Sequence, residues 1–336
     1  MVPASMAVTL GGIDRAQGGE RALRTQHPEA LKTLREIARI QSVESSNAIE
    51  QITAPSQRIR ALLGGQTTPA NRSEEEISGY RAALDTIHCS AEHIPFKPSV
   101  VEQFHRDLYQ FTNTPAGRWK SVENSIEEVT PAGVKVLRFQ TVTAIETPAA
   151  MDELHDRFAL ALDSGADHPL LLAGCYVFDF LAIHPFRDGN GRISRLLTLL
   201  LLYQAGYEVG RFISLERLID NTRETYYDAL RAAGHGWHED EHDIKPWLNY
   251  FLGIVTAAYN EFEGRVGTVS GRGSKREAIV QFVRLSTVAD FTVADVRRAV
   301  PAASQSYINK TLTKLRNERV IEPIGSGRNA RWRKLA

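Results

Sequence analysis

Cysteine is scarce in this chain: Cys89 and Cys175 are the only two among 336 residues. Two cysteines in a chain of this length do not make a disulfide framework, so a reducing compartment is the default expectation. Long apolar runs are also missing, because the most apolar segment, residues 196–202, is too short to span a bilayer. No basic region followed by an apolar stretch opens the sequence. We therefore expect a cytoplasmic protein without a membrane partner.

Net charge is absent as well, which by itself neither favours nor excludes nucleic acid as a partner. The zero total hides an uneven distribution. From residue 275 to the end there are thirteen Lys and Arg against five Asp and Glu, a net charge of +8, so residues 1–274 carry −8. A basic segment is thus joined to an acidic body, and the two need separate functional explanations.

Strand-like alternation is scarce, and helical periodicity dominates the body. One hairpin interrupts the helical pattern at residues 126–139, where two β-prone arms flank a Pro-Ala-Gly turn. The first twenty or so residues hold two Gly-Gly pairs and little periodicity, so we expect them to be loose. The pattern predicts helices over 28–41, 46–64, 73–90, 97–110, 147–163, 167–183, 189–206, 221–233 and 241–263.

The C-terminal part has its own pattern. Residues 264–274 are rich in Gly and Ser, which is typical of a linker. Beyond them we predict helices over 274–285, 293–299 and 304–319, then two short strands joined by a Gly-Ser-Gly turn. Three helices and a β-wing indicate a winged helix-turn-helix. The expected fold class is therefore mainly α, with a helical core, a β-hairpin and a C-terminal winged helix-turn-helix.

The strongest chemical signal is the stretch His184-Pro-Phe-Arg-Asp-Gly-Asn-Gly-Arg-Ile-Ser-Arg195. Its two glycines let the backbone adopt positive φ values and gather N–H groups into an anion-binding nest. The apolar run from residue 196 shows that a helix follows, and its N-terminus adds free N–H groups. Arg192 and Arg195 lie three apart and so share a face of the first turn. Two cations are unfavourable there unless an anion offsets them.

Asp188 and His184 complete this chemistry. Asp188 is a hard oxygen ligand beside the nest and suits a Mg²⁺ ion that bridges protein and phosphate. His184 precedes the nest and could take a proton from an incoming hydroxyl. Gly-Asn-Gly alone is typical of a turn, and His-Pro alone of a cap, but the complete string has no comparably simple structural explanation. We interpret it as a phosphate-binding active site that combines an anion nest, a metal ligand and a base.

This string resembles the signature of the Fic family, His-Pro-Phe-x-Asp/Glu-Gly-Asn-Gly-Arg-x-x-Arg, at every fixed position, and the similarity covers roughly residues 40–262. The resemblance implies a helical Fic core that transfers AMP from ATP to a Ser, Thr or Tyr hydroxyl of a target protein or of itself. It implies His184 as the base and Asp188 as the Mg²⁺ ligand. It also implies that Gly189, Asn190 and Gly191 surround the α- and β-phosphates and that Arg192 and Arg195 clamp the β- and γ-phosphates.

Ser46 and Glu50 resemble the family's inhibitory pattern, Ser/Thr-x-x-x-Glu-Gly/Asn. On its own the pattern favours helix capping, with a serine as the N-cap of a helix that opens here. The resemblance implies instead that Glu50 pairs with Arg195 and competes with phosphate for the same guanidinium. The family has Gly or Asn after the glutamate, whereas this chain has Gln51.

Three further segments carry weaker likenesses. The hairpin at 126–139 corresponds to the family's flap, which holds the target by strand-like pairing; an ordinary surface hairpin is the alternative. The turn Gly117-Arg-Trp-Lys120 resembles the family's Gly-x-Tyr/Trp-Arg turn, which we treat as structural. The segment Thr225-Tyr-Tyr-Asp-Ala-Leu230 resembles the family's Tyr-Tyr-x-x-Leu segment beside the adenine, and ordinary packing of the two tyrosines is the alternative. This chain has Gly234 at a position where such proteins often have Asn. The expected contacts from these segments are Gln140, Thr141, Val142 and Thr143 of the flap and Tyr226 and Tyr227 beside the adenine.

The domain organisation follows from these patterns. We expect an N-terminal helical region with the inhibitory helix over 1–95, a Fic domain over 96–263, a linker over 264–274 and the winged helix-turn-helix over 275–336. The basic tail could bind DNA, and the alternatives are a solvated face or a module for protein recognition or dimerisation, the latter giving a homodimer. The residues expected to face a DNA backbone are Lys310, Lys314, Arg328, Arg331 and Arg333.

Three alternative functions stay open for the signature site. The same residues could mainly remove AMP, or they could transfer another nucleotide. A third alternative is a DNA-binding regulator whose core only senses nucleotide. The complete His184 and Asp188 count against a sensor, because sensing needs no base.

Overall fold

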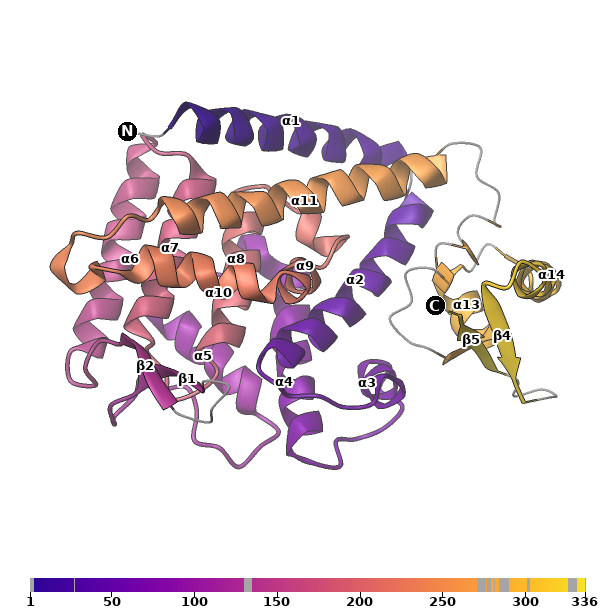
Figure 1. The fold of residues 1–336 in the computed structure, drawn as a ribbon, viewed down its shortest axis with the longest axis horizontal. Helices are drawn as coiled ribbons and strands as arrows, with labels where there is room; N and C mark the ends of the chain where they lie inside the picture. Colours follow the sequence, from indigo (N-terminus) through magenta and orange to yellow (C-terminus); the bar gives the residue numbers. More distant parts are fainter. Residues whose placement is uncertain are drawn as a thin grey trace.

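The computed structural model describes residues 3–26, 28–129, 135–270, 276, 279–280, 282–283, 290–300, 303–325 and 331–335. Within them the chain is mostly helical, with two small antiparallel sheets. Two separate clusters of buried apolar side chains lie between residues 6 and 266 and between residues 279 and 321. The body and the C-terminal lobe in Figure 1 therefore each have a core of their own.

The N-terminal segment is helical, so the prediction of a loose start was wrong. Helix α1 (Ala4–Gln26) lies along α11 (Lys245–Ser270), above the rest of the body in Figure 1. Met6, Leu10 and Ile13 stand at helical spacing and are buried in the main core. Each glycine costs a helix about 1 kcal/mol, and this buried stripe offsets that cost.

Helix α2 (Pro28–Ile49) runs unbroken through the region where we predicted one helix to end and another to begin. Ser46 therefore lies in its last turn, and Glu50 follows directly after it. The serine caps no helix N-terminus, which corrects the capping interpretation. The short helix α3 (Ser56–Leu63) comes after an irregular turn.

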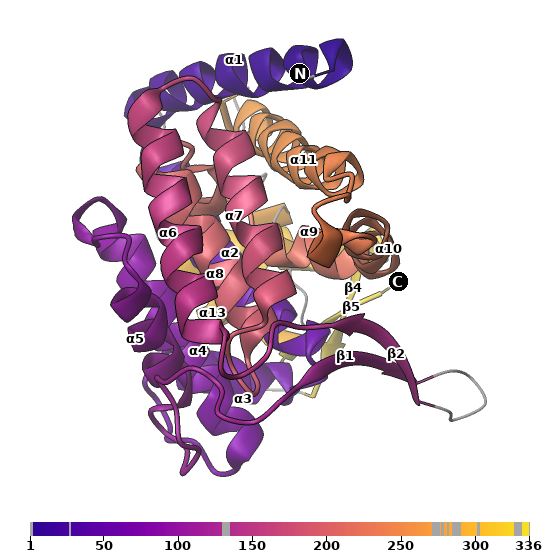
Figure 2. The same cartoon turned by 90° about the vertical axis from the view of Figure 1, so that its left-hand side faces the viewer.

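Residues 192–203 of α8 (Asn190–Gln204) are buried, and this helix contacts α2, α4, α5 and α7. Helices α6 and α7 lie side by side in Figure 2, and α7 also contacts α8. These elements agree with the predicted helices, except that the predicted helix over 221–233 is preceded by a separate short helix. The remaining helices of the body are α4 (Arg72–Ser90), η1 (Ala91–His93), α5 (Pro98–Tyr109), α6 (Thr147–Ser164), α7 (Pro169–Ile183), η2 (Val209–Arg211), α9 (Leu215–Asn221), α10 (Arg223–Gly234) and η3 (Trp237–Glu239).

The predicted hairpin is present. Strand β1 (Ser125–Val129) pairs antiparallel with β2 (Lys135–Gln140), and the register slips between Ile126 and Glu127. Figure 2 shows the hairpin projecting from the lower edge of the helical body. The turn itself, residues 130–134, lies outside the described residues.

The C-terminal lobe contains α13 (Val293–Ala299), α14 (Gln305–Asn317) and a three-stranded sheet. The sheet order is β3 (Asp290–Thr292), β5 (Arg331–Lys334) and β4 (Ile321–Ile324), all antiparallel. These elements agree with the predicted second and third helices and with both wing strands. Most of the predicted first helix lies outside the described residues.

The lobe is connected to the body by a helix rather than by the full linker that we predicted. Helix α11 continues to Ser270, so the first seven residues of the predicted linker are helical, and residues 271–274 lie outside the described residues. Thr33 of α2 donates a hydrogen bond from Oγ1 to the carbonyl of Ala299, at 2.6 Å. The helix that carries Ser46 thus also contacts the lobe. Among the described residues, no helix is both long and apolar enough to cross a membrane.

Candidate active site

The signature stretch forms the turn between α7 and α8. His184 follows the last residue of α7 and adopts a left-handed backbone with φ 53°, a conformation that costs a non-glycine residue about 1–2 kcal/mol. Gly189 has φ 83° and is the N-cap of α8. A Cβ at Gly189 would lie 3.0 Å from a methyl carbon of Leu108, so a glycine is required for space as well as for φ. The glycine turn and the helix N-terminus of the predicted nest are thus in place.

Asn190 shapes this turn with its side chain. Its Oδ1 accepts the N–H of Phe186 at 2.9 Å, and its Nδ2 donates to the carbonyl of Phe186 at 2.7 Å. Phe186 is buried and stacks on the ring of His105, with centroids 3.8 Å apart. The Asn190 amide is therefore used within the loop, and the loop is anchored in the core through Phe186.

His184 is placed as a neutral base. Its Nδ1 lies 3.2 Å from the carbonyl of Leu181, so the tautomer with a proton on Nδ1 leaves Nε2 unprotonated. Burial lowers the pKa of His184 to about 4, and the charge of Lys120 acts in the same direction. The imidazole is therefore uncharged at neutral pH and has one nitrogen that can accept a proton.

A cleft of about 990 Å³ opens in front of this loop. This volume lies at the upper end of the usual range for small-molecule sites and is ample for a nucleotide. Most of the residues predicted for the site line it, together with others that we did not predict. The signature contributes His184, Arg187, Asp188, Gly189, Asn190, Gly191 and Arg195; α10 contributes Tyr226, Tyr227, Leu230, Arg231 and Gly234; the hairpin contributes Ile126, Glu127, Arg138 and Phe139; and the turn after α2 contributes Glu50 and Gln51.

Arg195 and Glu50 meet at the inner end of this cleft. Arg195 donates from Nη2 to Glu50 Oε1 at 2.8 Å, and it also donates from Nε to Ser46 Oγ at 2.8 Å. Burial disfavours the guanidinium charge, but Glu50, Tyr226 and Tyr80 together outweigh burial and raise the pKa of Arg195. A Cβ at Gly191 would collide with the Glu50 carboxylate. The carboxylate therefore lies against the nest as well as against the arginine.

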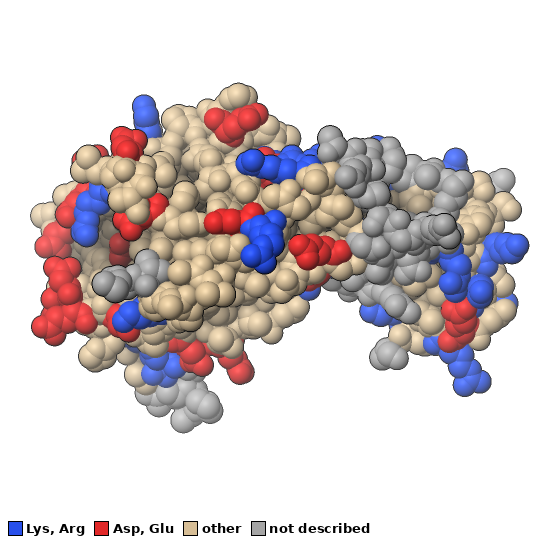
Figure 3. Space-filling view, turned by 90° about the horizontal axis from the view of Figure 1, so that it is seen from above, with Lys and Arg blue, Asp and Glu red and all other residues tan. Residues whose placement is uncertain are grey.

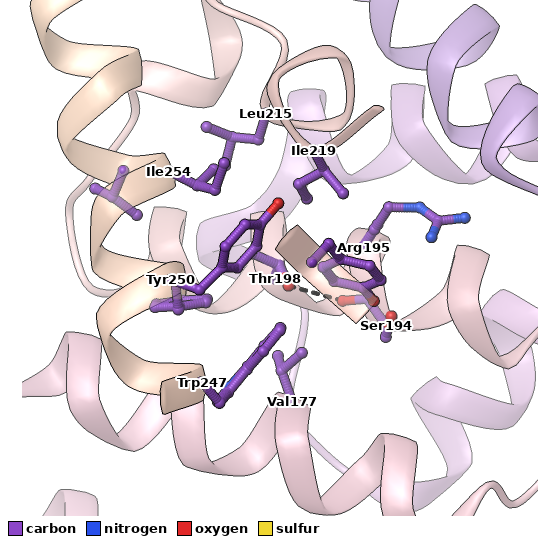
Figure 4. Close-up of a pocket in the computed structure, with 12 residues that line it drawn as sticks. Val177, Ser194, Arg195, Thr198, Leu215, Ile219, Trp247, Tyr250 and Ile254 are labelled. Carbon is purple, nitrogen blue, oxygen red and sulfur yellow. Dashed lines mark hydrogen bonds between the residues drawn. The ribbon is translucent and has the colours of Figure 1, made fainter. Parts of the chain in front are cut away.

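The stem of Arg195 passes an apolar wall. Figure 4 shows a small cavity behind it, about 20 Å³, which is room for about one water molecule. In the same view Thr198 donates from Oγ1 to the carbonyl of Ser194 at 2.8 Å, while the guanidinium points away from the cavity. Packing thus holds the stem and leaves the head at the cleft. Val177, Leu215, Ile219, Trp247, Tyr250 and Ile254 belong to this wall.

Arg192 lies elsewhere, which corrects the expectation that both arginines face one ligand. It is 1% exposed and is absent from the cleft lining. Its Nη1 pairs with Glu76 Oε2 at 2.8 Å, and its Nη2 donates to the hydroxyl of Tyr109 at 2.8 Å. Residues three apart on a helix differ by about 60° in direction, which is enough for long side chains to diverge. Both partners are distant in sequence, and no local signal marked them.

The segment Gln140–Thr143 is also displaced from the expected position, since none of its four residues lines the cleft. Thr141 is 1% exposed and bonds inward to Asn124. Strand β2 ends at Gln140, so the chain leaves the hairpin there and turns into the body. The hairpin residues that do line the cleft precede this point.

The surroundings of Asp188 suit a metal ligand. Its carboxylate belongs to the cleft lining, and one oxygen accepts the N–H of Gly189 at 2.7 Å. Among the described residues, no group of three or more His, Cys, Asp or Glu could hold a metal ion. A cation here would have one protein carboxylate and would take its other ligands from phosphate and water, which is the donor set that Mg²⁺ accepts.

Residues 95–202 match the model of the Fic/DOC family, and the signature loop lies inside that match. Residues 95–202 are therefore similar to a Fic domain. Protein adenylyltransferase fic-1 of Caenorhabditis briggsae is 27% identical over 253 residues, which are 73% of this chain and 45% of that protein. Protein adenylyltransferase Fic of Nematostella vectensis is 28% identical over 222 residues, 63% of this chain and 46% of that protein. The chain thus spans about half the length of these curated relatives.

Solved Fic structures share the fold. A Fic family protein from Desulfovibrio desulfuricans superimposes with a TM-score of 0.66 over 100% of this chain and 97% of that one, at 20% identity. A Fic domain containing signalling protein from Bacteroides thetaiotaomicron gives a TM-score of 0.64 over 76% of this chain and 97% of that one, at 25% identity. The mainly helical fold class is therefore confirmed, and the first match extends over the C-terminal lobe.

Proposed function

We propose that this chain is a Mg²⁺-dependent protein adenylyltransferase that Glu50 holds inactive. The observation that carries the proposal is the position of the Glu50 carboxylate, bonded to Arg195 and lying against Gly191. An anion of the chain itself thus occupies the place that a helix N-terminus and an arginine offer to a phosphate. The relatives named above are adenylyltransferases, which supports ATP as the substrate.

In the proposed reaction, Nε2 of His184 takes the proton from a Ser, Thr or Tyr hydroxyl of the target. The hydroxyl oxygen forms a bond to the α-phosphorus of ATP, the bond from that phosphorus to the oxygen bridging the β-phosphate breaks, and pyrophosphate leaves. The N–H groups of residues 190 and 191 stabilise the negative charge on the α-phosphate oxygens. Bound phosphates also raise the proton affinity of His184, since nearby negative charge favours imidazolium.

Asp188 is the residue that would hold the Mg²⁺ ion, with phosphate oxygens as further ligands. Bound there, the ion would neutralise charge on the phosphates that leave. The protein contributes the orientation: Asp188 is fixed by the Gly189 N–H, and Gly189 caps the helix that carries the arginines.

The acceptor in this proposal is an extended protein segment. Ile126 and Phe139 face each other in the β1–β2 register, and both line the cleft. A short antiparallel ribbon beside a catalytic cleft can pair its edge with an incoming strand. An extended segment of this chain itself could pair with the hairpin in the same way, which accounts for the self-modification that we expect.

Labelled ATP tests the reaction. Wild type, Glu50→Gly and His184→Ala are incubated with Mg²⁺ and ATP labelled at the α- or the γ-phosphate. We expect α-label on the chain, strongest in Glu50→Gly and absent in His184→Ala, whereas Glu92→Gln, at an exposed glutamate outside the cleft, serves as the matched control and behaves as wild type. Label from the γ-position alone would overturn AMP transfer in favour of phosphorylation, and no label from any variant would favour a nucleotide sensor.

As a second function, we propose that the C-terminal lobe binds duplex DNA. Helix α14 buries Ile308, Leu312 and Leu315 and turns the opposite side to solvent. That side exposes Ser306, Asn309, Lys310, Thr313 and Lys314, all hydrogen-bonding or basic, and the helix contains no Asp or Glu. A polar helix of this kind beside a β-wing suits the major groove. In Figure 3, Lys and Arg predominate on the lobe at the right, while Asp and Glu gather at the opposite, left-hand end of the body.

The basic residues of the wing differ from what we predicted. Arg333 pairs with Asp290 at 2.9 Å, so it is engaged within the sheet. Arg328 lies outside the described residues. The DNA proposal therefore rests on the α14 residues Lys310 and Lys314.

Salt-dependent affinity tests the DNA proposal. The full chain is titrated with a labelled duplex at several salt concentrations, beside Lys310→Glu/Lys314→Glu and beside Lys97→Glu, an exposed lysine of the body. We expect affinity to fall steeply with salt, and the double variant to flatten this slope while Lys97→Glu keeps it. No binding, or the same slope in both variants, would reject the proposal.

A further inference from the structure

The phosphate-binding loop has a second face, which points away from the cleft and consists of carbonyl oxygens. Lys120 contacts it twice: its Nζ donates to the carbonyl of Ile183 at 3.1 Å, and its backbone N–H donates to the carbonyl of Pro185 at 2.8 Å. These two carbonyls belong to the residues immediately before and after His184. One residue from a different segment thus holds both sides of the proposed base.

Two more side chains extend this contact along the loop. Asn124 donates from Nδ2 to the carbonyl of Phe186 at 2.8 Å, and His105 Nε2 lies 3.1 Å from the carbonyl of Asp188. The carbonyls of 183, 185, 186 and 188 are therefore all bound from behind. Binding the carbonyls from behind leaves N–H groups to form the anion site on the cleft side.

Lys120 stands at the centre of this arrangement. It is 5% exposed, and its ammonium donates to Asn124 Oδ1 at 2.7 Å and to Thr141 Oγ1 at 3.0 Å as well as to Ile183. All three ammonium protons thus have an acceptor, and none of the three acceptors is a carboxylate. A buried lysine of this kind is costly for the fold, which indicates a specific use.

We propose that Lys120 is a positioning residue for the reaction assigned above, because it fixes the His184 peptide and, through Asn124, the carbonyl side of the phosphate-binding loop. The proposal rests on that reaction. Ile183 ends α7, so its carbonyl is one of the unpaired acceptors at a helix C-terminus, where a cation is favourable. The left-handed backbone of His184 needs such support, because it is strained.

The residue type makes the role testable by pH. Burial lowers the pKa of Lys120 to about 8, while Glu123 on the same segment acts to raise it. The Lys120 charge also acts on His184, whose pKa of about 4 leaves it neutral throughout the alkaline range. As pH rises through about 8, the ammonium therefore loses one donor and the loop loses support. Arginine at this position would stay charged.

The experiment compares Lys120→Arg, Lys120→Met and Thr141→Val in the Glu50→Gly background. We expect Lys120→Met to lower kcat/KM for α-label transfer by about tenfold or more, since small displacements at a catalytic centre are this costly. Lys120→Arg should keep activity and move the alkaline decline to higher pH. Thr141→Val removes one acceptor, so it should move the decline to lower pH, and it is a conservative change if the lysine variants fold poorly. An unchanged rate in Lys120→Met, or one alkaline profile shared by all variants, overturns the proposal.

A second readout does not need activity. In spectra of the chain with ¹³C-labelled lysine, the Lys120 signal is the one missing from Lys120→Arg, and we expect it to titrate well below the other lysines. Titration near the ordinary lysine value of about 10.4 would overturn the proposal. If Glu50→Gly itself transfers no label, the proposed reaction fails, and this titration still tests the placement of Lys120.

Discussion

The two faces of the loop at 184–191 differ in what holds them. The cleft face meets Glu50 and Arg195, and the Glu50 side chain is 32% exposed. The rear face meets Lys120, Asn124 and His105, and the helix behind it is tied down by Arg192, whose contact with Glu76 is buried. A partly exposed ion pair is weak enough to be displaced by a ligand, whereas a buried one is not. The comparison teaches that the proposed regulatory contact lies on one face of the loop and the structural support on the other.

The two arginines of the signature show this division most directly. They start from one turn of α8, yet Arg195 reaches the cleft and Arg192 reaches Glu76 on α4 and Tyr109 on α5. Changes on the cleft face should therefore alter activity with little effect on stability. Changes on the rear side should reduce stability first.

The largest expected effect is on the cleft face. We expect His184→Ala to lower the rate of label transfer by about 10²–10⁴-fold, because a positioned general base contributes this much. The free energy of unfolding from urea titration should change little, since the substitution removes one hydrogen bond and leaves the loop's other contacts. A large loss of stability together with the loss of activity would show that the two faces are not separable.

The next effect belongs to the rear side. Glu76→Gln leaves the Arg192 charge buried beside a neutral partner, and we expect it to cost about 3 kcal/mol of unfolding free energy. Urea denaturation measures it. Arg72→Gln is the matched control, since it removes the more exposed partner of the same glutamate. Equal and small effects from both substitutions would mean that the buried ion pair does not stabilise the rear side of the loop.

Much of this site could be predicted from the sequence, and the exceptions have a common cause. The turn at Gly189 and the following helix are local, so glycine chemistry was enough to expect them. The Glu50–Arg195 contact joins residues 145 apart, and only the family resemblance pointed to it. Arg192, Lys120 and the segment after Gln140 depend on packing between distant elements. No local pattern encodes which side a long side chain takes there.

Helix α1 is the clearest failure at the level of the fold. Its glycines disfavour a helix locally, but tertiary burial of Met6, Leu10 and Ile13 decided the outcome. Helix α2 teaches the same lesson. It packs against α9 and α4, and it stays helical where local signals suggested that a new helix begins.

The smallest expected effect concerns the end of α2. Gln51 has φ 61°, and the N–H of Ile52 donates to the carbonyl of Asn47 at 2.9 Å, as in a Schellman turn. This conformation costs a non-glycine residue about 1 kcal/mol, so the family's Gly at this place has a physical reason. We expect Gln51→Gly to stabilise the turn that holds Glu50 against Arg195, and therefore to slow basal label transfer about fivefold. In the Glu50→Gly background the same change should have no effect on the rate, and an equal slowing there would exclude an action through Glu50.

The most direct test of the account is the initial rate of α-label transfer in wild type, Glu50→Gln and Glu50→Gly at one ATP concentration. Glutamine keeps the size of the side chain and removes its charge, whereas glycine removes both. If the carboxylate holds the phosphate site closed through Arg195 and the nest, the rate rises from wild type to Glu50→Gln and again to Glu50→Gly, by about tenfold or more overall. Equal rates in the three proteins would contradict it.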